Sequence, residues 1–386
     1  MTSQRLRVLQ LIDSLARAGA EQSLASLAPH LLDEGIDVHV AYLIERDGLR
    51  PDIEKAGIPV HSLAEGMARR GRWLARVARL LDQLEPALVH TTLFEADLAG
   101  RRAAARLRIP CVSSFVNTAY GQTESGRDGL SRLRVLGAQG ADAYTARKVT
   151  RFHAVTRHVA TVMGRRLRIP PTKIDVIPRG RDAAVLGRRS PHRRSAVRER
   201  LGVGENTPLV LAVGRQEPQK GFDVLLRALP TLKQRIPDVH VVIAGRPGRA
   251  SEALTEQAAA ARLAGAVRFL GMRDDVPDLM ASADVLAFPS LWEGAAGTLQ
   301  EAMALECPIV TSGLPTILET VDAATAAIVA PGSSEDLAQG LLSVLEDPVA
   351  SRRRAVAARA RFERDFTIEV SARRMADLYF RTAAAA

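Results

Sequence analysis

The sequence predicts an α/β fold of two doubly wound domains, and three observations support this fold class. The chain has 386 residues, more than a single hydrophobic core usually organises. Short apolar segments of strand length alternate with longer segments of helix length, which is the pattern of βαβ units around a parallel sheet. The alternation stops once, in the basic stretch 178–206, and then resumes. We therefore expect two Rossmann-like domains that face each other across a cleft.

The first half of the chain supplies the elements of one such domain. Its strands are expected at Leu6–Ile12, Asp37–Leu43, Ala87–His90, Cys111–Phe115, Phe152–Val155 and Lys173–Ile177. Its helices are expected at about 20–34, 72–84, 95–107, 128–147 and 156–167. Helices then cover both faces of a parallel sheet, and ligands bind at the carboxyl ends of its strands.

The second half repeats the alternation. Strands are expected at Leu209–Val213, Val239–Ala244, Val267–Leu270, Val285–Phe288, Ile309–Thr311 and Ala327–Val329. Helices are expected at about 221–235, 251–263, 275–281 and 298–304, with one more at Phe366–Thr382. The stretch 178–206 is interpreted as the linker and the start of the second domain. The predicted division is 1–180, 181–366 and a final helix in 367–386.

The net charge of +10 resides in the first half. Residues 1–180 hold 27 Lys and Arg against 18 Asp and Glu, net +9, whereas residues 181–386 hold 26 against 25, net +1. The excess is either a solvated surface or a surface for an anionic partner, such as a lipid headgroup or a phosphorylated acceptor. Nucleic acid is not expected, because only 4% of the residues are aromatic and no aromatic-interleaved basic patch occurs.

Neither a membrane span nor a metal site is predicted. Asp13 arrives before the apolar core of a signal peptide could develop, and no apolar run approaches the roughly 20 residues of a spanning helix. A cytoplasmic protein is therefore expected, with peripheral contact at the inner face of the membrane as the alternative. Cys111 and Cys307 stand far apart, without a CxxC pair or a Cys/His cluster, so neither a disulfide framework nor a zinc site is indicated.

The most specific motif is Glu293–Glu301, with the sequence EGAAGTLQE, directly after the apolar segment Val285–Phe288. A strand, a turn of small residues and a helix beginning near Thr298 direct backbone N–H groups and the positive end of a helix dipole at one spot, with a carboxylate on each side. This arrangement suits a nucleotide-sugar diphosphate. In the alternative, Glu293 is a surface residue and Glu301 only complements the helix dipole.

Two further turns carry cations or glycine where a phosphate could bind. Arg215 and Lys220 lie five residues apart between the strand Leu209–Val213 and the next helix, so a bidentate fork and a compact ammonium could converge on a diphosphate. Gly19 follows the first strand and opens the first helix, where its backbone could approach a phosphate. The alternatives are solvated loop charges and an ordinary strand-to-helix turn.

These motifs together resemble those of retaining glycosyltransferases of family 4, which have the GT-B fold. The matching segments, in the order of the family, are Gly19–Glu21, His90–Thr92, Lys173–Pro178, Gly214–Gly221, Phe269–Gly271, Ala283–Ser290 and Glu293–Glu301. The resemblance implies transfer of a hexose from a nucleotide-diphosphate sugar, with UDP more common than GDP, to a hydroxyl of a glycan, lipid-linked or small-molecule acceptor. It implies an acceptor-binding first domain, a donor-binding second domain and a last helix that returns to the first.

The resemblance also implies roles for single residues. Arg215 and Lys220 would neutralise the departing diphosphate, and Glu293 would hold the donor sugar; these three form the implied catalytic set. Further donor contacts would come from Gly19, Met272, Arg273, Gly297, Thr298, Leu299 and Glu301, with Glu301 on the ribose and Met272 and Arg273 near the base. Sugar or acceptor contacts would come from Glu21, His90, Asn117 and Arg179. No cofactor and no metal are implied, because preorganised cations and a helix N-terminus can stabilise the leaving group.

Two departures from the family pattern concern the first domain and the linker. Asn117 stands where many members carry a His; it can hydrogen-bond a sugar but cannot carry a proton. Arg179 and Arg181 belong to an Arg-Gly-Arg-Asp turn in place of Asn-Gly-Val-Asp. Three hypotheses follow: a retaining glycosyltransferase, a GT-B epimerase or phosphorylase, and a sugar-nucleotide-binding protein without turnover. Retention of Arg215, Lys220 and both glutamates argues against the third.

The segment 69–84 allows two interpretations. Its apolar stripe consists of Leu74, Val77, Leu81 and Leu84, and its basic stripe of Arg69, Arg72, Arg76 and Arg79, with Trp73 beside them. Such a helix either packs on the sheet with solvated arginines or lies on an anionic lipid surface. The first is favoured because the segment leads straight into the strand Ala87–His90.

Overall fold

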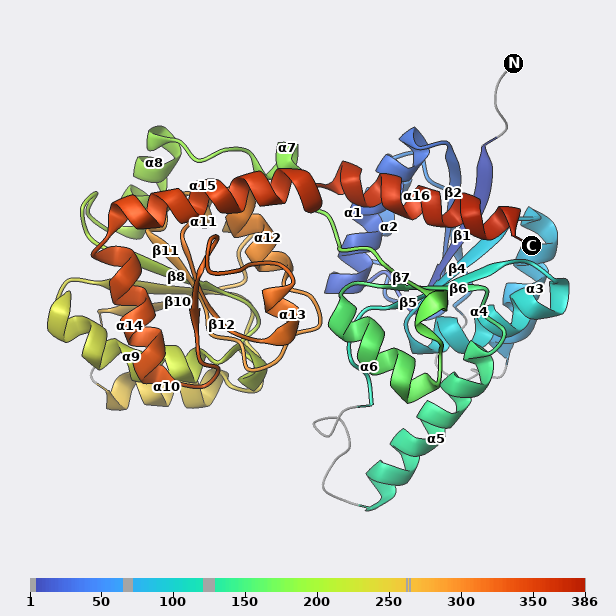
Figure 1. The fold of residues 1–386 in the computed structure, drawn as a ribbon, viewed down its shortest axis with the longest axis horizontal. Helices are drawn as coiled ribbons and strands as arrows, with labels where there is room; N and C mark the ends of the chain where they lie inside the picture. The colour runs from blue at the N-terminus through green and yellow to red at the C-terminus, as the bar shows by residue number, and fades with distance from the viewer. Residues whose placement is uncertain (1–4, 65–71, 121–128, 262, 264, 386) are drawn as a thin grey trace. The chain divides into compact units, whose positions relative to one another are not determined.

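The structure is a computed structural model that describes residues 5–64, 72–120, 129–261, 263 and 265–385. Arg69 of the basic stripe, and Asp128 and Arg262 of the expected helices 128–147 and 251–263, lie outside these ranges. The chain forms two compact units, each with its own parallel sheet (Figure 1). The first unit comprises Met1–Gly180 and Ile368–Ala386, and the second comprises Arg181–Thr367.

The first unit holds a seven-stranded sheet in the order β3-β2-β1-β4-β5-β6-β7. Its strands are β1 Leu6–Ile12, β2 Ile36–Tyr42, β3 Val60–Ser62, β4 Leu88–Thr92, β5 Cys111–Phe115, β6 Arg151–Ala154 and β7 Ile174–Val176, and all neighbours pair in parallel. The strand order reverses between β1 and β4, so the loops after these two strands diverge and leave room for a ligand.

Helices connect these strands, and one from the end of the chain joins them. They are α1 Gly19–Asp33, α2 Arg50–Lys55, α3 Trp73–Leu84, α4 Phe94–Leu107, α5 Gly129–Ala146, α6 Arg157–Leu167 and α16 Ile368–Ala384. Figure 1 shows α16 beside α1, and the two helices pack against each other. Leu378, Tyr379 and Met375 of α16 are buried in the same core as Val8 and Ile12 of β1. Each fully buried side chain of this size contributes roughly 1.5–3 kcal/mol, so α16 is part of this core.

The helix α3 shows how the described part of the segment 69–84 packs. Val77, Leu80 and Leu81 are buried, and α3 packs against α4. Arg76 donates a hydrogen bond to the carbonyl oxygen of Leu63 at 2.8 Å. The packing of the apolar stripe against the unit is therefore confirmed for the described residues of this helix.

The second unit holds a six-stranded sheet in the order β10-β9-β8-β11-β12-β13. Its strands are β8 Leu209–Val213, β9 His240–Ala244, β10 Val267–Gly271, β11 Val285–Phe288, β12 Ile309–Ser312 and β13 Ala327–Val329. Its helices are α7 Ala183–Leu186, α8 Pro191–Leu201, α9 Phe222–Arg235, α10 Ser251–Ala260, α11 Val276–Ser282, α12 Gly297–Ala304, α13 Pro315–Leu318, α14 Ser334–Leu345 and α15 Pro348–Asp365. Here the order reverses between β8 and β11.

Both faces of this second sheet are covered, which explains its unbroken apolar strands. Leu211 and Leu286 belong to the core on one face, and Val210 and Val285 to the core on the other. The expected strands and helices of both units are confirmed to within three residues at their ends. The alternation did not indicate α2, β3, α7, α13, α14 or α15.

The stretch 178–206 contains the start of the second unit at Arg181, and it is not a linker throughout, because α8 occupies Pro191–Leu201. Ser190 caps this helix by accepting a hydrogen bond from the backbone N–H of Arg193, and Gly202 ends it with φ of +62°. Arg198 is fully buried and donates hydrogen bonds to the carbonyl oxygens of Gly204 and Ser282. The Ser-Pro start and the glycine end are recognisable helix signals; the density of arginines obscured them.

Candidate active site

The candidate donor site of the second unit lies where β8 and β11 are neighbours. The two strands pair in parallel, so the loops that follow them leave the same edge of the sheet. The loop after β8 carries Arg215 and Lys220, and the loop after β11 carries Glu293. This is the point of strand-order reversal at which open α/β sheets bind ligands.

The loop after β8 is shaped by two glycines. Gly221 has φ of +62°, and a Cβ on it would lie 2.1 Å from the carbonyl oxygen of Pro289. Only glycine therefore lets this loop approach the end of β11 so closely. A Cβ on Gly214 would contact the methylenes of Lys220 at 3.2 Å, so the lysine stem lies flat along the backbone at the end of β8. Arg215 is exposed on the same loop.

Lys220 and Glu293 form an ion pair. The ammonium Nζ lies 2.6 Å from Glu293 Oε1, with 18% of the lysine side chain and 6% of the glutamate side chain exposed. Glu293 Oε1 also accepts from the Ser290 hydroxyl at 2.8 Å, and Oε2 from Gln219 Nε2 at 3.4 Å. Lys220 Nζ lies 5.3 Å from the ring centroid of Phe288. Two further donors, Ser290 and Gln219, and the aromatic face of Phe288 thus hold this pair in one geometry before any ligand binds.

The helix α12, which follows the loop after β11, carries a second carboxylate. Glu301 Oε1 accepts from Arg181 Nε at 2.8 Å, and each side chain is 24% exposed. The guanidinium lies against the first residue of the helix, because a Cβ on Gly297 would be 1.8 Å from Arg181 Nη2. Arg181 was recognised in the sequence only as a departure in the linker turn. Its position on Glu301 could not be read from the sequence, since 120 residues separate the two.

The other residues of this unit that were expected to contact the sugar donor differ in how far their side chains are exposed. Leu299 is fully buried in the core, so only its backbone could meet a ligand. Thr298 follows Gly297 in the first turn of α12, and its side chain is half-buried. Met272 is 66% exposed after β10. Arg273 is held by Asp275, with Nε and Nη2 at 2.8 and 2.7 Å from its two carboxylate oxygens.

In the first unit, the turn after β1 holds two of the expected residues. Gly19 is the first residue of α1, and a Cβ on it would lie 3.7 Å from Arg179 Nη1. Arg179, which the sequence places in the linker turn, therefore lies close to the start of α1. Glu21 is buried, and its carboxylate accepts a hydrogen bond from the Ser14 hydroxyl at 3.3 Å.

His90 is buried within β4, in a chain of hydrogen bonds that crosses the first unit. The chain consists of Gln10, Tyr379, His90, Ser114 and His153, which come from β1, α16, β4, β5 and β6. Successive donor and acceptor atoms are 2.6, 2.5, 2.7 and 2.7 Å apart, and His153 Nε2 ends the chain 2.8 Å from the carbonyl oxygen of Ile177. Of these residues only His90 was expected to have a role; polar residues inside strands give no sequence signal.

The last acceptor fixes which atom donates in each of these hydrogen bonds. A carbonyl oxygen only accepts, so Nε2 of His153 carries the proton and its Nδ1 accepts from Ser114. His90 Nε2 must then donate to Ser114, and Tyr379 must donate to His90 Nδ1. Burial lowers the pKa of His90 to about 3 and that of His153 to about 4, in agreement with two neutral rings. Both ring nitrogens of His90 are thus already hydrogen-bonded.

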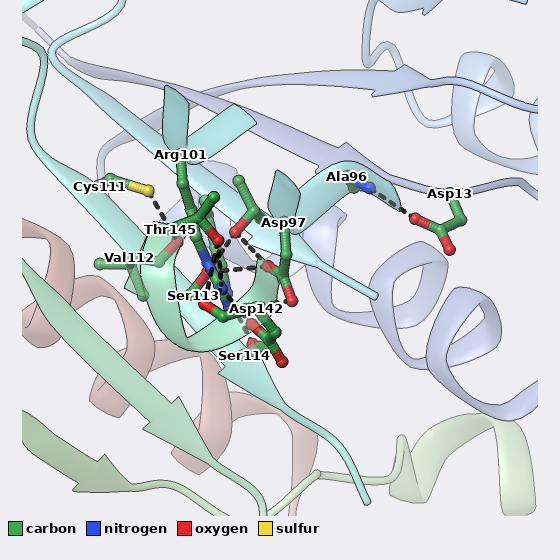
Figure 2. Close-up of polar contacts among 12 residues, drawn as sticks. Asp13, Ala96, Asp97, Arg101, Cys111, Val112, Ser113, Ser114, Asp142 and Thr145 are labelled. Atoms are coloured by element: carbon green, nitrogen blue, oxygen red, sulfur yellow. Dashed lines mark hydrogen bonds and ion pairs between the residues drawn. The ribbon is translucent and has the colours of Figure 1, made fainter. Parts of the chain in front are cut away.

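Asp13 follows β1 and reaches the N-terminus of α4, a contact absent from the sequence-based expectations. Its Oδ1 accepts from the backbone N–H of Ala96 at 2.7 Å (Figure 2). Burial raises the pKa of this carboxyl to about 7, the two backbone hydrogen bonds lower it, and the nearby Asp97 and Glu95 raise it. Asp13 therefore changes charge near neutral pH.

Asn117 is exposed just after β5, and hydrogen bonds hold the three residues that follow it. Arg166 of α6 donates to the carbonyl oxygens of Thr118 and Ala119. Tyr120 donates to Asp142 Oδ2 at 2.8 Å. These contacts fix the backbone on which Asn117 stands.

Asp142 belongs to a buried cluster around Arg101 (Figure 2). Arg101 is fully buried; it pairs with Asp97 at 3.1 Å and with Asp142, and its Nε donates to Ser113 at 2.7 Å. Burial raises the pKa of Asp97 to about 6, although the charge of Arg101 opposes this. The cluster ties α4, α5 and β5 together beneath the Asn117 loop, and we assign it a structural role.

Three general features complete the description. Among the residues that the structure describes, no three His, Cys, Asp or Glu side chains are grouped as a metal site would need. No helix in the same ranges combines the length and the apolar character required to cross a bilayer. Cys111 and Cys307 are both buried and free.

Two protein-family models match the chain. The model described as "Glycosyltransferase Family 4" matches residues 17–185, and the one described as "Glycosyl transferases group 1" matches residues 193–362. The first falls largely in the first unit and the second lies within the second unit. Together they leave only the ends of the chain and a short stretch before α8 unmatched.

Curated relatives carry glycosyltransferase names. The chain is 37% identical over 210 residues to a glycogen synthase of Mycobacterium tuberculosis, a match that covers 54% of this chain and 48% of that protein. The chain thus spans about half the length of that relative. It is 28% identical over 391 residues to a D-inositol 3-phosphate glycosyltransferase of Rhodococcus jostii, covering 96% of this chain and 83% of that one.

Solved structures share the fold. HepE from Anabaena, solved in complex with UDP, superposes with a TM-score of 0.83 at 24% identity over 97% of this chain and 100% of HepE. At this identity the likeness establishes the fold, which is GT-B.

Proposed function

Because this chain belongs to glycosyltransferase family 4, we propose that it transfers a sugar from a nucleotide-diphosphate sugar to a hydroxyl of its acceptor, with retention at the anomeric carbon. The observation that carries the proposal is the Lys220–Glu293 pair, which is largely shielded from solvent and lies at the strand-order reversal of the second unit. A charged pair held by Ser290 and Gln219 beside an apolar core is preorganised for a polar, anionic ligand.

In this proposal Lys220 and Arg215 act on the leaving diphosphate. The bond between the anomeric carbon and a phosphate oxygen breaks, a bond to the acceptor oxygen forms on the same face, and the acceptor proton passes to the departing phosphate. Lys220 has three N–H donors, so it can keep its contact with Glu293 while binding a phosphate oxygen. Removing one such preorganised donor typically costs roughly 10²–10³-fold in kcat.

The two carboxylates serve different parts of the donor. Glu293 would accept hydrogen bonds from the sugar hydroxyls, and Glu301 from the ribose hydroxyls. Because Glu301 Oε1 is paired with Arg181, the ribose must share this carboxylate or displace the guanidinium. The backbone N–H groups of Gly297 and Thr298 would face the diphosphate at the positive end of α12.

We propose that the donor is a UDP-sugar, because HepE, which shares the fold over the whole chain, was solved with UDP and with UDP-glucose. We propose that the reaction needs no metal, since Lys220 and Arg215 supply the positive charge. Turnover that is unchanged by excess EDTA and by added Mg²⁺ or Mn²⁺ is the expected result; loss of turnover in EDTA with recovery on adding metal would contradict metal independence.

We further propose that the first unit binds the acceptor and that the enzyme works in the cytoplasm. The surplus of nine positive charges in residues 1–180 suits an acceptor or membrane surface that carries negative charge. At saturating donor, the acceptor KM should rise with salt concentration, because salt screens the charges of the first unit. An acceptor KM that does not change with salt would contradict this role of the surplus charge.

A thermal-shift screen with UDP, GDP, ADP and their glucose and mannose conjugates tests the proposed donor, because a ligand that binds only the folded chain raises its apparent stability. We expect the largest shift with the UDP series, and its loss in Lys220→Ala. Lys233→Ala is the matched control, a lysine of α9 in the same unit, and should keep the shift. A shift that persists in Lys220→Ala would contradict the proposed site.

A further inference from the structure

The first unit contains a pocket between the carboxyl half of its sheet and the helices α1 and α16. Its empty space is about 590 Å³, including solvent at its mouth. It is lined from the strand side by residues of β1, β4, β5 and β6, and from the helix side by Ala20, Leu24 and Met375 among others. All nineteen lining residues belong to the first unit.

The walls of this pocket are mainly apolar. Leu24 and Leu27 of α1 face it together with Ile368 and Met375 of α16, and Val155 lines it just after β6. Ser23, Thr92 and Ser371 also line the pocket, but a hydroxyl held against the apolar side chains would lose water without gaining a partner, at a cost of roughly 1–3 kcal/mol. The apolar part of the wall therefore favours an alkyl group over a sugar or a nucleotide.

The floor of the pocket is polar but uncharged. Gln10, His90, Ser114, His153 and Tyr379 all line it, and they form the directed hydrogen-bond chain described above. Along that chain each donor already has an acceptor, and both imidazoles stay neutral because burial lowers the pKa of each far below 7. The floor thus offers no counter-charge to a charged ligand.

One formal charge stands at the edge of this neutral pocket. Among the nineteen lining residues, all within the described part of the chain, Arg179 is the one Lys, Arg, Asp or Glu. Its guanidinium is close enough to His153 to help lower the pKa of that ring, and Nη1 lies near Gly19. Arg179 belongs to the turn in which this sequence departs from the pattern of its family.

We infer that this pocket binds an amphiphile with one anionic group, its apolar part between α1 and α16 and its phosphate or carboxylate at Arg179. The inference rests on the proposed function in one respect, because we take this amphiphile to be the acceptor, which must also carry a free hydroxyl. The binding itself requires only the pocket and its single cation. Charge and shape together select the ligand: the apolar walls disfavour a free anion, and the positive charge of Arg179 disfavours a cation.

Titration calorimetry with monomeric octyl phosphate tests this binding, with octyl glucoside and inorganic phosphate as comparison ligands. We expect octyl phosphate to bind at least tenfold more tightly than either. Arg179→Gln removes the charge, and Ala20→Leu fills the apolar space from the face of α1 without removing a hydrogen bond. Each should weaken octyl phosphate binding at least tenfold. Arg50→Gln, which removes an exposed arginine outside the pocket, should bind like the wild type.

UDP binding to each variant separates the possible failures. Arg179→Gln and Ala20→Leu should bind UDP like the wild type, which shows that they fold and that the second unit is intact. Retained UDP binding with equal affinity for octyl phosphate and octyl glucoside, or with no effect of either variant, would overturn the inference and leave the proposed function standing. Absence of UDP binding in the wild type would instead count against the proposed function.

Discussion

Gly297 and Gly221 lack a side chain for different reasons, and replacing each with alanine should separate function from stability. A Cβ on Gly221 would meet the backbone oxygen of Pro289 at 2.1 Å, and φ is +62°. The clash and the left-handed backbone cannot relax, so Gly221→Ala should cost roughly 1–3 kcal/mol or more. A Cβ on Gly297 would meet Arg181 Nη2 at 1.8 Å, the mobile end of a side chain.

Gly297→Ala should therefore leave the free energy of unfolding within about 1 kcal/mol of the wild type. It should also displace Arg181 from Glu301 and place a methyl group where we propose the diphosphate binds. We expect kcat/KM to fall about 10- to 100-fold. Urea denaturation and steady-state kinetics of both variants check this pair of predictions. A destabilised Gly297→Ala, or one with normal turnover, would contradict our description of the α12 terminus.

Asp13 provides a prediction for pH. Its folded pKa of about 7 lies above the ordinary 3.8, so the carboxyl contributes its full stability below pH 4 and loses it as the pH rises through 7. Asp13→Asn keeps an oxygen that can accept from Ala96 but has no charge. The variant should gain stability relative to the wild type between pH 4 and pH 7, by up to about 4 kcal/mol.

Subtracting the two stability curves isolates Asp13, because Asp97, Glu95 and the buried histidines are present in both proteins. Urea denaturation at intervals of pH between 4 and 8 supplies the curves. A stability difference that does not change over this range would mean that Asp13 titrates at its ordinary pKa in the folded chain.

At the scale of elements, Arg101 holds α4, α5 and β5 together. Arg101→Met should cost about 3–5 kcal/mol, because it leaves the buried carboxylates of Asp97 and Asp142 without a counter-charge. Arg50→Met, which breaks an exposed pair on α2, should cost much less. Urea denaturation of the two variants gives the comparison, and equal losses would show that the Arg101 cluster is not the tie that we describe.

The alternation of apolar and amphipathic segments predicted most strands and helices, since strands such as Val285–Phe288 are covered on both faces and read as unbroken apolar runs. It failed at α8, where arginines made a helix look like a linker. Arg198 is buried there by donating to backbone carbonyl oxygens, an arrangement that composition cannot reveal. It also missed α14, although Ser333 caps that helix.

At the scale of the whole chain, the sequence predicted the residues of the candidate donor site better than those of the first unit. Lys220 and Glu293 follow strands that turned out to be neighbours, so their positions after strands placed them at one edge of the sheet. The hydrogen-bonded series that runs from Gln10 to His153 is different, because four of its five residues lie inside strands. The fifth, Tyr379, comes from α16 at the other end of the sequence. Only the folded unit brings these residues together, which is why the pocket could not be anticipated.

The Lys220–Glu293 pair as donor site is the central claim, and a crystal structure of the chain with UDP tests it most directly. We expect a phosphate oxygen within hydrogen-bond distance of Lys220 Nζ, the diphosphate at the N-terminus of α12, and the ribose on Glu301 with Arg181 moved or shared. UDP bound elsewhere, with the Lys220–Glu293 and Arg181–Glu301 pairs unchanged and their surroundings empty, would contradict the account.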